Sequence, residues 1–417
     1  MGDPDFFDDY FAYTALTEPP RIYARWCAIS GIATLLGRNL TVPFGHKNLI
    51  PNQYIMLVGE SGSRKSSAIY IMRKLLQECG YDTIAAERTS KEKFLLDLQD
   101  GLYGDEGADS EVLERTGSSL WKDTGEIREC LIAADEFNDF VGNGNIDFLS
   151  MLGSLWDFDG IYKARVKNSK SVAIPSPTIN MLAGNTSDRL ASAIPIDAIG
   201  QGFTSRLLLI HGVKSDRKFS KPPTPSAQET QKIISSLQRI QTTCRGTATP
   251  DKEADEWLDR LYNSWKPLED SRFAAYSSRR YVHLLKLCAV FAAARYETNI
   301  TKRDCIYANT VLTLAELGMP KTFGEFGKAK NSGTANKIIE YLDRSDSPRS
   351  IRDIFRAVSS DIEKVSDLVT ILQNLEKASK IQLVKDKGWL PLKKALVSDN
   401  TEFLDWSLID KGELENG

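Results

Sequence analysis

The feature that most constrains this chain is a short apolar run followed by a glycine-bracketed turn and a Lys-Ser pair. Residues 54–58 read YIMLV, a run typical of a strand buried on both faces of a parallel sheet. Residues 59–66 read GESGSRKS, and residues 67–79 carry a helical pattern that ends before Gly80. This order of strand, turn and helix is typical of a phosphate-binding loop. In such a loop backbone N–H groups surround a triphosphate, a lysine meets the outer phosphates and a hydroxyl binds Mg²⁺.

The turn therefore predicts a nucleotide site, with ATP and Mg²⁺ as its ligands. We expect Lys65 to bind the outer phosphates and the hydroxyl of Ser66 to bind the metal. The usual pattern has a glycine immediately before the lysine, whereas this chain has Arg64. The predicted ATP-binding residues are Gly59, Glu60, Ser61, Gly62, Ser63, Arg64, Lys65, Ser66 and Ser67.

Two later apolar runs end in polar residues that suit phosphoryl transfer. Residues 130–134 read CLIAA and lead into Asp135 and Glu136, the order of a Walker B segment. We expect Asp135 to hold the magnesium shell and Glu136 to orient and deprotonate the attacking water. Asn185 directly follows the apolar run at 179–184, and its position predicts a contact with that water or with the γ-phosphate. The sequence Asn-Thr-Ser is equally compatible with an ordinary loop.

These motifs, in this order, resemble those of the MCM-type AAA+ helicases. GESGSRKS is similar to their GDPGxAKS, which also lacks the last glycine, and DEFN at 135–138 is similar to their DEFD. Ser205-Arg206, before the apolar run at 207–210, is similar to their arginine-finger motif SRFD, although Leu207 replaces the Phe. The likeness covers roughly residues 20–395 and is strongest to the compact helicases of phages and mobile elements. We do not expect the chain to include the amino-terminal oligonucleotide-binding domain and zinc module of the cellular members.

The resemblance implies an α/β fold with an AAA+ P-loop NTPase core, an α-helical lid and a C-terminal winged-helix domain. In that fold Arg206 cannot reach its own nucleotide and serves a neighbouring subunit, which implies a homo-oligomeric ring, expected to be a hexamer. An arginine in the third lid helix of AAA+ proteins reaches the γ-phosphate, and we assign this role to Arg280, with Arg279 as the alternative. Nearby His283 is interpreted as a packed residue.

Composition shifts divide the chain into five segments. They are an extension at 1–50, the ATPase core at 51–214, a helical lid and linker at 215–330, a winged helix at 331–395 and an acidic tail at 396–417 that we expect to be mobile. The fourth segment predicts three helices and a hairpin, and it is compatible with DNA binding or with packing between subunits.

Residues 162–172 read YKARVKNSKSV and predict a β-hairpin with a polar turn. An ordinary surface hairpin with solvated lysines is one interpretation. In MCM-like proteins, however, a hairpin just before the third strand motif projects into the ring. The resemblance then implies that four cations grip single-stranded DNA, namely Lys163, Arg165, Lys167 and Lys170.

Bulk properties add a few limits. The net charge is −3, which neither suggests nor excludes nucleic-acid binding. No apolar stretch approaches 18 residues, so no membrane segment is expected. Six cysteines without a C-x-x-C pair predict buried thiols in a reducing compartment, and we expect a cytoplasmic protein.

The sequence thus predicts an ATP-driven, ring-forming DNA helicase for replication of a phage or mobile element. One alternative is an AAA+ ATPase that remodels a protein partner, against which the lysine-rich hairpin argues. The other is a DNA-binding initiator with little ATPase activity, against which the intact Lys65, Ser66, Asp135 and Glu136 argue.

Overall fold

The structure is a computed structural model, and it forms two compact units. One unit comprises residues 1–324 and 400–417, and the other comprises residues 325–399. The residues that it describes are 5–100, 128–165, 171–195, 198, 202–268, 270–322, 332–343, 345, 347–359, 361–362, 364–377, 381–384, 388–391 and 400–414.

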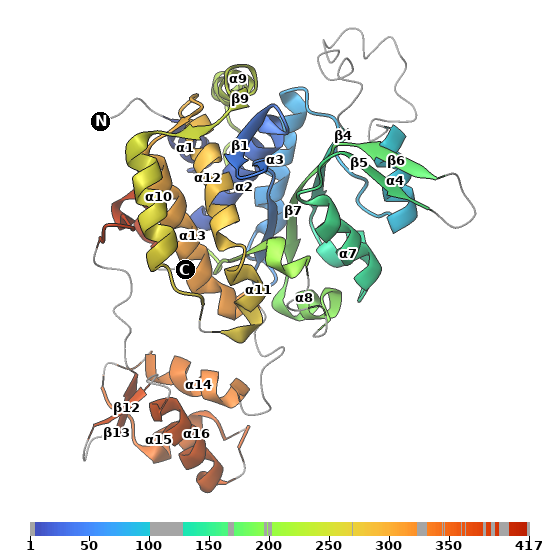
Figure 1. Ribbon diagram of the computed structural model, residues 1–417. Coiled ribbons are helices and arrows are strands. Elements are labelled where there is room, and N and C mark those ends of the chain that lie inside the picture. Colours follow the sequence, from blue (N-terminus) through green and yellow to red (C-terminus); the bar gives the residue numbers. More distant parts are fainter. Residues whose placement is uncertain are drawn as a thin grey trace. The chain divides into compact units, whose positions relative to one another are not determined.

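A parallel sheet of four strands lies at the centre of the first unit, in the order β4-β7-β3-β8 (Figure 1). The apolar runs of the sequence form these strands, and β3 and β7 are buried along their whole length. The predicted class, mixed α/β with a parallel sheet, is therefore confirmed. Beside β4, Ile84 forms one isolated parallel bridge with Leu131. The strand bounds are Tyr54–Val58 for β3, Arg128–Ala134 for β4, Pro177–Asn185 for β7 and Leu207–His211 for β8.

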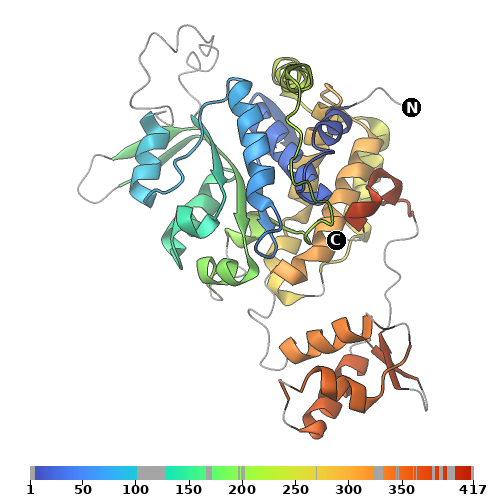
Figure 2. The same cartoon turned by 180° about the vertical axis from the view of Figure 1, so that it is seen from behind.

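Helices cover both sides of this sheet (Figures 1 and 2). Helix α2 (Arg21–Leu36) and helix α3 (Lys65–Glu78) contact each other and β7, while α13 (Lys302–Thr322) packs along β8. The remaining longer helices of this unit are α1 (Phe6–Tyr13), α4 (Lys91–Asp100), α7 (Ile146–Leu155), α9 (Ala227–Thr243), α10 (Lys252–Ser264) and α12 (Arg280–Ala294). The shorter ones are α6 (Phe137–Val141), α8 (Ser187–Ala193) and α11 (Ala274–Ser277).

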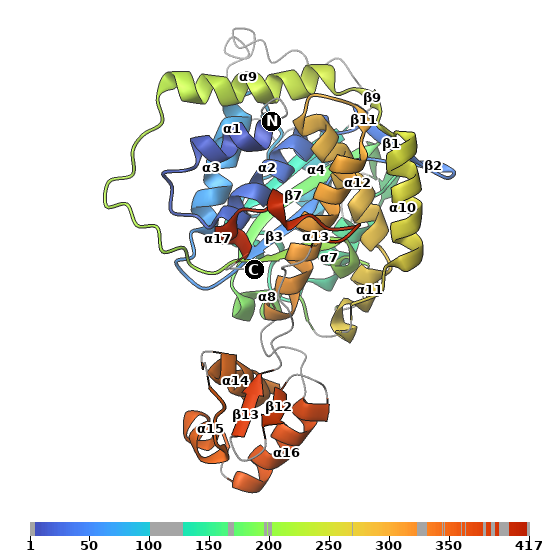
Figure 3. The ribbon, with the colours of Figure 1, turned by 90° about the vertical axis from the view of Figure 1, so that its left-hand side faces the viewer.

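The segments predicted as extension, core and lid pack as one unit. Strand β1 (Leu40–Phe44) pairs antiparallel with β2 (Lys47–Leu49) and parallel with β9 (Gly246–Thr247). Residues that precede the four central strands in the sequence therefore meet residues that follow them. Helix α1 was not predicted. Asp5 caps it by accepting a hydrogen bond from the N–H of Asp8 at 3.1 Å, and the ring of Phe7 stacks on Phe291 with centroids 5.0 Å apart. Figure 3 shows the long helix α9 running past α1 and α3.

The C-terminal segment is ordered against the first unit, so the prediction of a mobile tail is wrong for residues 400–414 (Figure 3). Trp257 Nε1 donates a hydrogen bond to the carbonyl of Glu402 at 2.9 Å, and Asn309 Nδ2 donates to the carbonyl of Phe403 at 2.7 Å. Trp406 is buried at the start of a 3-10 turn, and a short helix, α17 (Lys411–Leu414), ends the described chain. Apolar burial therefore overrides the acidic composition of this segment.

The second unit has three helices and an antiparallel hairpin, the elements that the sequence predicts. Its core is built from apolar side chains of all of them, including Ile338, Leu342, Ile354, Leu368, Leu372, Ile381 and Trp389. The helices are α14 (Ser332–Asp343), α15 (Ile351–Ala357) and α16 (Val365–Lys377), and the hairpin strands are β12 (Ile381–Val384) and β13 (Gly388–Pro391).

Two bulk predictions can be compared with the described part of the chain. Across it, no helix combines the length and the apolar character needed to cross a membrane. All six cysteines are free thiols; five are buried and Cys79 is partly exposed.

Candidate active site

The predicted nucleotide-site residues come together where the carboxyl ends of the parallel strands lie, which we call the carboxyl edge of the sheet. The parallel strands β3, β4 and β7 all end there, and ligands of such sheets bind outside the carboxyl ends of the strands. Val58 pairs with Asn185, and the N–H of Gly59 donates to the carbonyl of Asn185 at 3.3 Å. A Cβ atom at Gly184 would lie 2.6 Å from the carbonyl oxygen of Asp135, so glycine permits the close approach of these two strand ends.

The loop at 59–66 turns tightly between β3 and α3. A Cβ atom at Gly59 would lie 2.6 Å from the carbonyl oxygen of Gly212, which only glycine avoids. Gly62 has φ +82°, and Arg64 has φ +65°, in the left-handed region. Arg64 thus adopts a conformation natural to the glycine that usually stands there, at a cost of roughly 1–2 kcal/mol for a residue with a Cβ. Of the loop residues, Gly59, Ser63 and Lys65 are buried, whereas Glu60, Ser61, Gly62, Arg64, Ser66 and Ser67 are exposed.

Lys65 is the first residue of α3, and its ammonium group lies inside the loop. Its Nζ donates to the carbonyl oxygens of Gly59 at 2.8 Å and Glu60 at 2.9 Å, and to Ser63 Oγ at 3.2 Å. Burial lowers the pKa of Lys65, and the negative charge of Glu136 opposes that shift. A cation held in this way is placed to exchange loop carbonyls for the phosphate oxygens of a nucleotide.

Asp135 and Glu136 follow β4 at the same edge. Partial desolvation raises the pKa of Asp135, against the opposing charge of Arg73. Glu136 forms an ion pair with Arg189, with 3.3 Å between Oε2 and Nη1. Arg189 lies on α8, which begins just after Asn185, and no role for it was predicted from the sequence. Its position four residues beyond the third strand motif was the available signal.

The donor set fits a magnesium ion that is bound together with a nucleotide. The hydroxyl of Ser66 and the carboxylate of Asp135 are hard oxygen ligands, and Mg²⁺ is commonly held by one or two protein oxygens plus substrate phosphates. Within the described ranges, no group of three or more His, Cys, Asp and Glu side chains is placed so that it could hold a metal ion by itself.

Asn185 is fully buried, and a second asparagine orients its side chain. Its Nδ2 donates to Asn138 Oδ1 at 2.7 Å, and its Oδ1 accepts from the N–H of Thr186 at 3.0 Å. Asn138 Nδ2 in turn donates to Asn143 Oδ1 at 2.6 Å and to the carbonyl of Arg189 at 2.9 Å. Asn138, the last residue of the DEFN motif, is one for which the sequence alone predicted no role. Paired amides therefore connect the segment after β4 to the end of β7.

Arg206 lies at the opposite edge of the sheet, which is formed by the amino ends of the parallel strands. It ends a 3-10 turn directly before β8, whose first residue, Leu207, pairs with Tyr54 at the start of β3. The five residues of β3, at about 3.3 Å each, separate this edge from the loop. The structure thus brings Lys65, Asp135, Glu136 and Asn185 together but does not bring Arg206 to them within one chain.

The guanidinium of Arg206 lies beside a pocket of about 330 Å³. It donates to the carbonyl of Gly202 and lies 5.9 Å from the ring centroid of Trp156. Burial lowers the pKa of Arg206, and the nearby positive charge of Arg279 lowers it further. The pocket is lined by Ile146, Leu149, Gly153, Phe203, Arg206 and Arg279, among others.

The prediction that Arg280 reaches the γ-phosphate is corrected by the geometry. Arg280 is 3% exposed, and its Nε lies 2.6 Å from Glu316 Oε1. Its Nη2 also donates to Asn309 Oδ1 at 3.0 Å, and its guanidinium lies 4.9 Å from the ring centroid of Trp265. This side chain is committed to the packing of α12 on α13. Arg279, the alternative, is half-buried beside Arg206. His283 is fully buried and lies 3.1 Å from the carbonyl oxygen of Ser205, in agreement with a packed residue.

The predicted hairpin is present as β5 (Ile161–Ala164) and β6 (Val172–Pro175), which pair antiparallel. Lys163 and Arg165 are exposed on it. Lys167 and Lys170 lie outside the described residues. The hairpin is anchored to α4, because the N–H of Ala173 donates to Gln99 Oε1 at 2.8 Å.

Comparison with known proteins gives no further guide to this site. No protein-family model matches the chain, and a search of curated proteins found no similar sequence.

Proposed function

We propose that this chain is an ATP-driven DNA translocase, a ring-forming helicase of the AAA+ type that serves the replication of a phage or mobile element. One observation carries the proposal. The phosphate-loop lysine, the Walker B carboxylates and Asn185 meet at the carboxyl edge of one parallel sheet, while Arg206 lies at its other edge.

The carboxyl-edge residues supply the parts that phosphoryl transfer needs. Lys65 would neutralise charge on the outer phosphates, and Ser66 and Asp135 would hold Mg²⁺, which would supply further positive charge to the phosphates. Glu136 accepts a proton from the attacking water, and Arg189 holds its carboxylate until then. Asn185, oriented by Asn138, positions the water or the γ-phosphate.

The place of Arg206 supports assembly of a homo-oligomer. An arginine that stabilises transition-state charge can come from another subunit. Arg206 and Arg279 lie together at a pocket distant from their own loop, so each subunit can present both to the nucleotide of a neighbour. A closed ring, expected to be a hexamer, satisfies every site in this way.

DNA is the proposed track. Lys163 and Arg165 are exposed on the β5–β6 hairpin, and with Lys167 and Lys170 they offer cations to the phosphates of a single strand. In the second unit, three helices and a hairpin agree with a winged helix, which we assign to DNA or to a neighbouring subunit. The cytoplasm is the proposed location.

The test is the ATPase rate of the purified chain alone, with single-stranded DNA and with duplex DNA. Stimulation by DNA supports the proposal, and strand separation of a forked duplex that requires ATP extends it. ATP hydrolysis that neither DNA stimulates would favour remodelling of a protein partner. DNA binding without ATP hydrolysis would favour an initiator.

A further inference from the structure

We propose that Glu18 is a positioning residue for the nucleotide loop, because its carboxylate holds Arg64 in the left-handed conformation that the loop requires. The inference rests on the proposed function in one respect, that the loop binds a nucleotide. It does not depend on DNA or on a ring.

The first observation is the conformation of Arg64. This residue stands where glycine is usual, and its φ of +65° is one that L side chains rarely adopt. It directly precedes Lys65, the first residue of α3. A relaxation of Arg64 would therefore turn the N–H groups of the loop and move the start of α3 together with Lys65.

The second observation is the contact that opposes this relaxation. Arg64 Nε lies 2.5 Å from Glu18 Oε2, and the two side chains are 51% and 19% exposed. A charge-assisted hydrogen bond of this length is among the stronger polar contacts of a protein surface. Glu18 comes from the segment before α2, so a residue far from the motif holds the loop.

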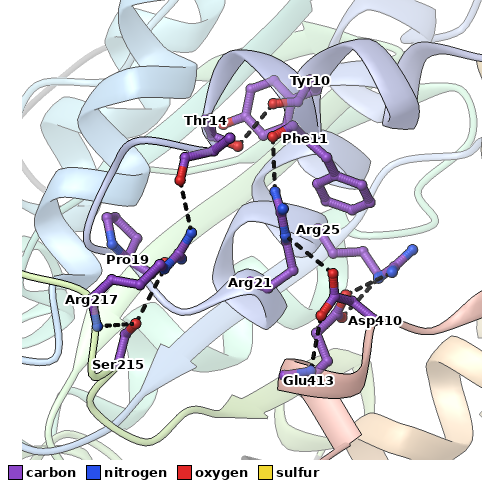
Figure 4. Close-up of polar contacts among 12 residues, drawn as sticks. Tyr10, Phe11, Thr14, Pro19, Arg21, Arg25, Ser215, Arg217, Asp410 and Glu413 are labelled. Atoms are coloured by element: carbon purple, nitrogen blue, oxygen red, sulfur yellow. Dashed lines mark hydrogen bonds and ion pairs between the residues drawn. The ribbon is translucent and has the colours of Figure 1, made fainter. Parts of the chain in front are cut away.

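The third observation is that Glu18 is itself fixed. Its Oε1 accepts from the N–H of Phe219 at 3.0 Å. That bond, with a smaller effect of Arg64, lowers the pKa of Glu18, so the carboxylate is charged at neutral pH. Arg217 joins the same two segments by donating to the carbonyl oxygens of Ala15, at 3.3 Å, and Pro19. Figure 4 shows Arg217 reaching from Ser215 toward the segment that ends at Pro19.

Both segments also border a pocket of about 410 Å³ directly beside the loop. Its lining includes Glu18, Gly62, Arg64, Lys214, Arg217 and Phe219. The residues that hold Glu18 in place therefore lie beside the nucleotide loop.

The experiment is a double-mutant cycle read by the Kd for MgATP at low salt, with thermal unfolding of each variant as a check on folding. Its four proteins are the parent, Glu18→Gln, Arg64→Gly and the double variant. The Gln side chain keeps an acceptor for Phe219 N–H but removes the charge that holds Arg64. Glycine takes the left-handed conformation without that help.

We expect Glu18→Gln to weaken MgATP binding about 5- to 30-fold in the parent, the factor that 1–2 kcal/mol represents. In the Arg64→Gly background the same change is expected to alter the Kd less than about twofold. The matched control is Asp9→Asn, which removes another N-terminal ion pair, to Lys232 at 2.6 Å, with exposures of 13% and 65%. It is expected to leave the Kd within about twofold, because this pair matches the Glu18–Arg64 pair in length and exposure but neither of its residues belongs to the nucleotide loop.

Three results would overturn the inference: no change in Kd for Glu18→Gln, an equal loss in both backgrounds, or tighter binding, which would make the pair an inhibitory latch. If the parent itself fails to bind MgATP, the proposed function falls and this inference falls with it. If the parent binds and Glu18 has no effect, only the inference falls.

Discussion

Arg25 and Glu413 form a buried two-point ion pair between the two ends of the chain (Figure 4). Arg25 Nε and Nη2 donate to the two carboxylate oxygens at 2.8 Å and 2.7 Å, and the side chains are 2% and 0% exposed. Arg25 lies on α2, which also contacts the central sheet. The end of the chain is therefore locked to the body that carries the candidate active site.

Glu413→Ala is expected to lower the free energy of unfolding by about 3–5 kcal/mol, because it leaves the buried Arg25 charge without a counter-charge, although Arg25 still donates to the hydroxyl of Tyr307. Denaturant unfolding measures the change. The matched control is Glu402→Ala, which removes an exposed pair in the same segment, 2.8 Å from Arg260 with exposures of 54% and 49%. That loss is expected to stay below about 1 kcal/mol. Equal losses in the two variants would contradict a special role for the buried pair.

Lys65→Ala is expected to abolish MgATP binding, because the outer phosphates lose the cation that the loop holds at Gly59 and Glu60. Glu136→Gln is expected to keep MgATP binding and to stop turnover, because the amide cannot accept the proton of the attacking water. Binding titration and a steady-state ATPase assay separate the two effects. ATP hydrolysis by Glu136→Gln at the parental rate would show that the Walker B assignment is wrong.

Arg279→Ala and Arg280→Ala are expected to have different effects, one on ATP hydrolysis and the other on stability, although the residues are adjacent. Arg280 is buried against Glu316, so its loss should lower the free energy of unfolding by about 3–5 kcal/mol. Arg279 is half-buried beside Arg206, so its loss should spare stability and slow ATP hydrolysis at unchanged MgATP affinity. Unfolding curves and the ATPase assay give both readouts. A stable Arg280→Ala variant with slow hydrolysis would restore the assignment made from sequence.

The central sheet could be predicted because each strand is an apolar run with a clear end. The edge at which Lys65, Asp135 and Asn185 meet followed from those ends. The errors have a different origin. Arg279 and Arg280 differ by one position, about 100° around a helix, and only the packing on α13 decides which of them is buried.

The acidic tail was misjudged for a related reason. Glu413 is stabilised by Arg25, a partner 388 positions away, and no local pattern reports such a contact. The Asn138–Asn185 pair and the Glu18–Arg64 pair likewise join residues that are distant in the sequence. These contacts can be recognised only once the positions of the strand ends in space are known.

The hairpin cations are open to a separate test. Replacing Lys163 and Arg165 with Ala is expected to weaken single-stranded DNA binding at low salt and to reduce the slope of log K against log salt by about 0.7 per cation. ATPase activity without DNA should be unchanged, because neither residue lies at the loop. Lys252→Ala, which removes a 90% exposed lysine on α10, is the control and should leave the slope unaltered. A double variant with the parental slope would remove the hairpin from the DNA path.

Arg206→Ala is expected to bind MgATP as the parent does and to hydrolyse it poorly, because Arg206 lies at the sheet edge opposite its own loop. Lys65→Ala subunits lack a working loop but keep Arg206. Mixing the two variants places an intact loop beside an intact arginine at some interfaces, so part of the ATPase activity should return.

Energy transfer between parent and Arg206→Ala subunits that carry different fluorescent labels serves as the control for subunit exchange. If the two inactive variants restore no activity at any ratio while exchange is demonstrated, Arg206 does not act on a neighbouring subunit. The argument for a ring would then lose its support, whereas the assignments of Lys65 and Glu136 would remain, since they depend only on the carboxyl edge of the sheet.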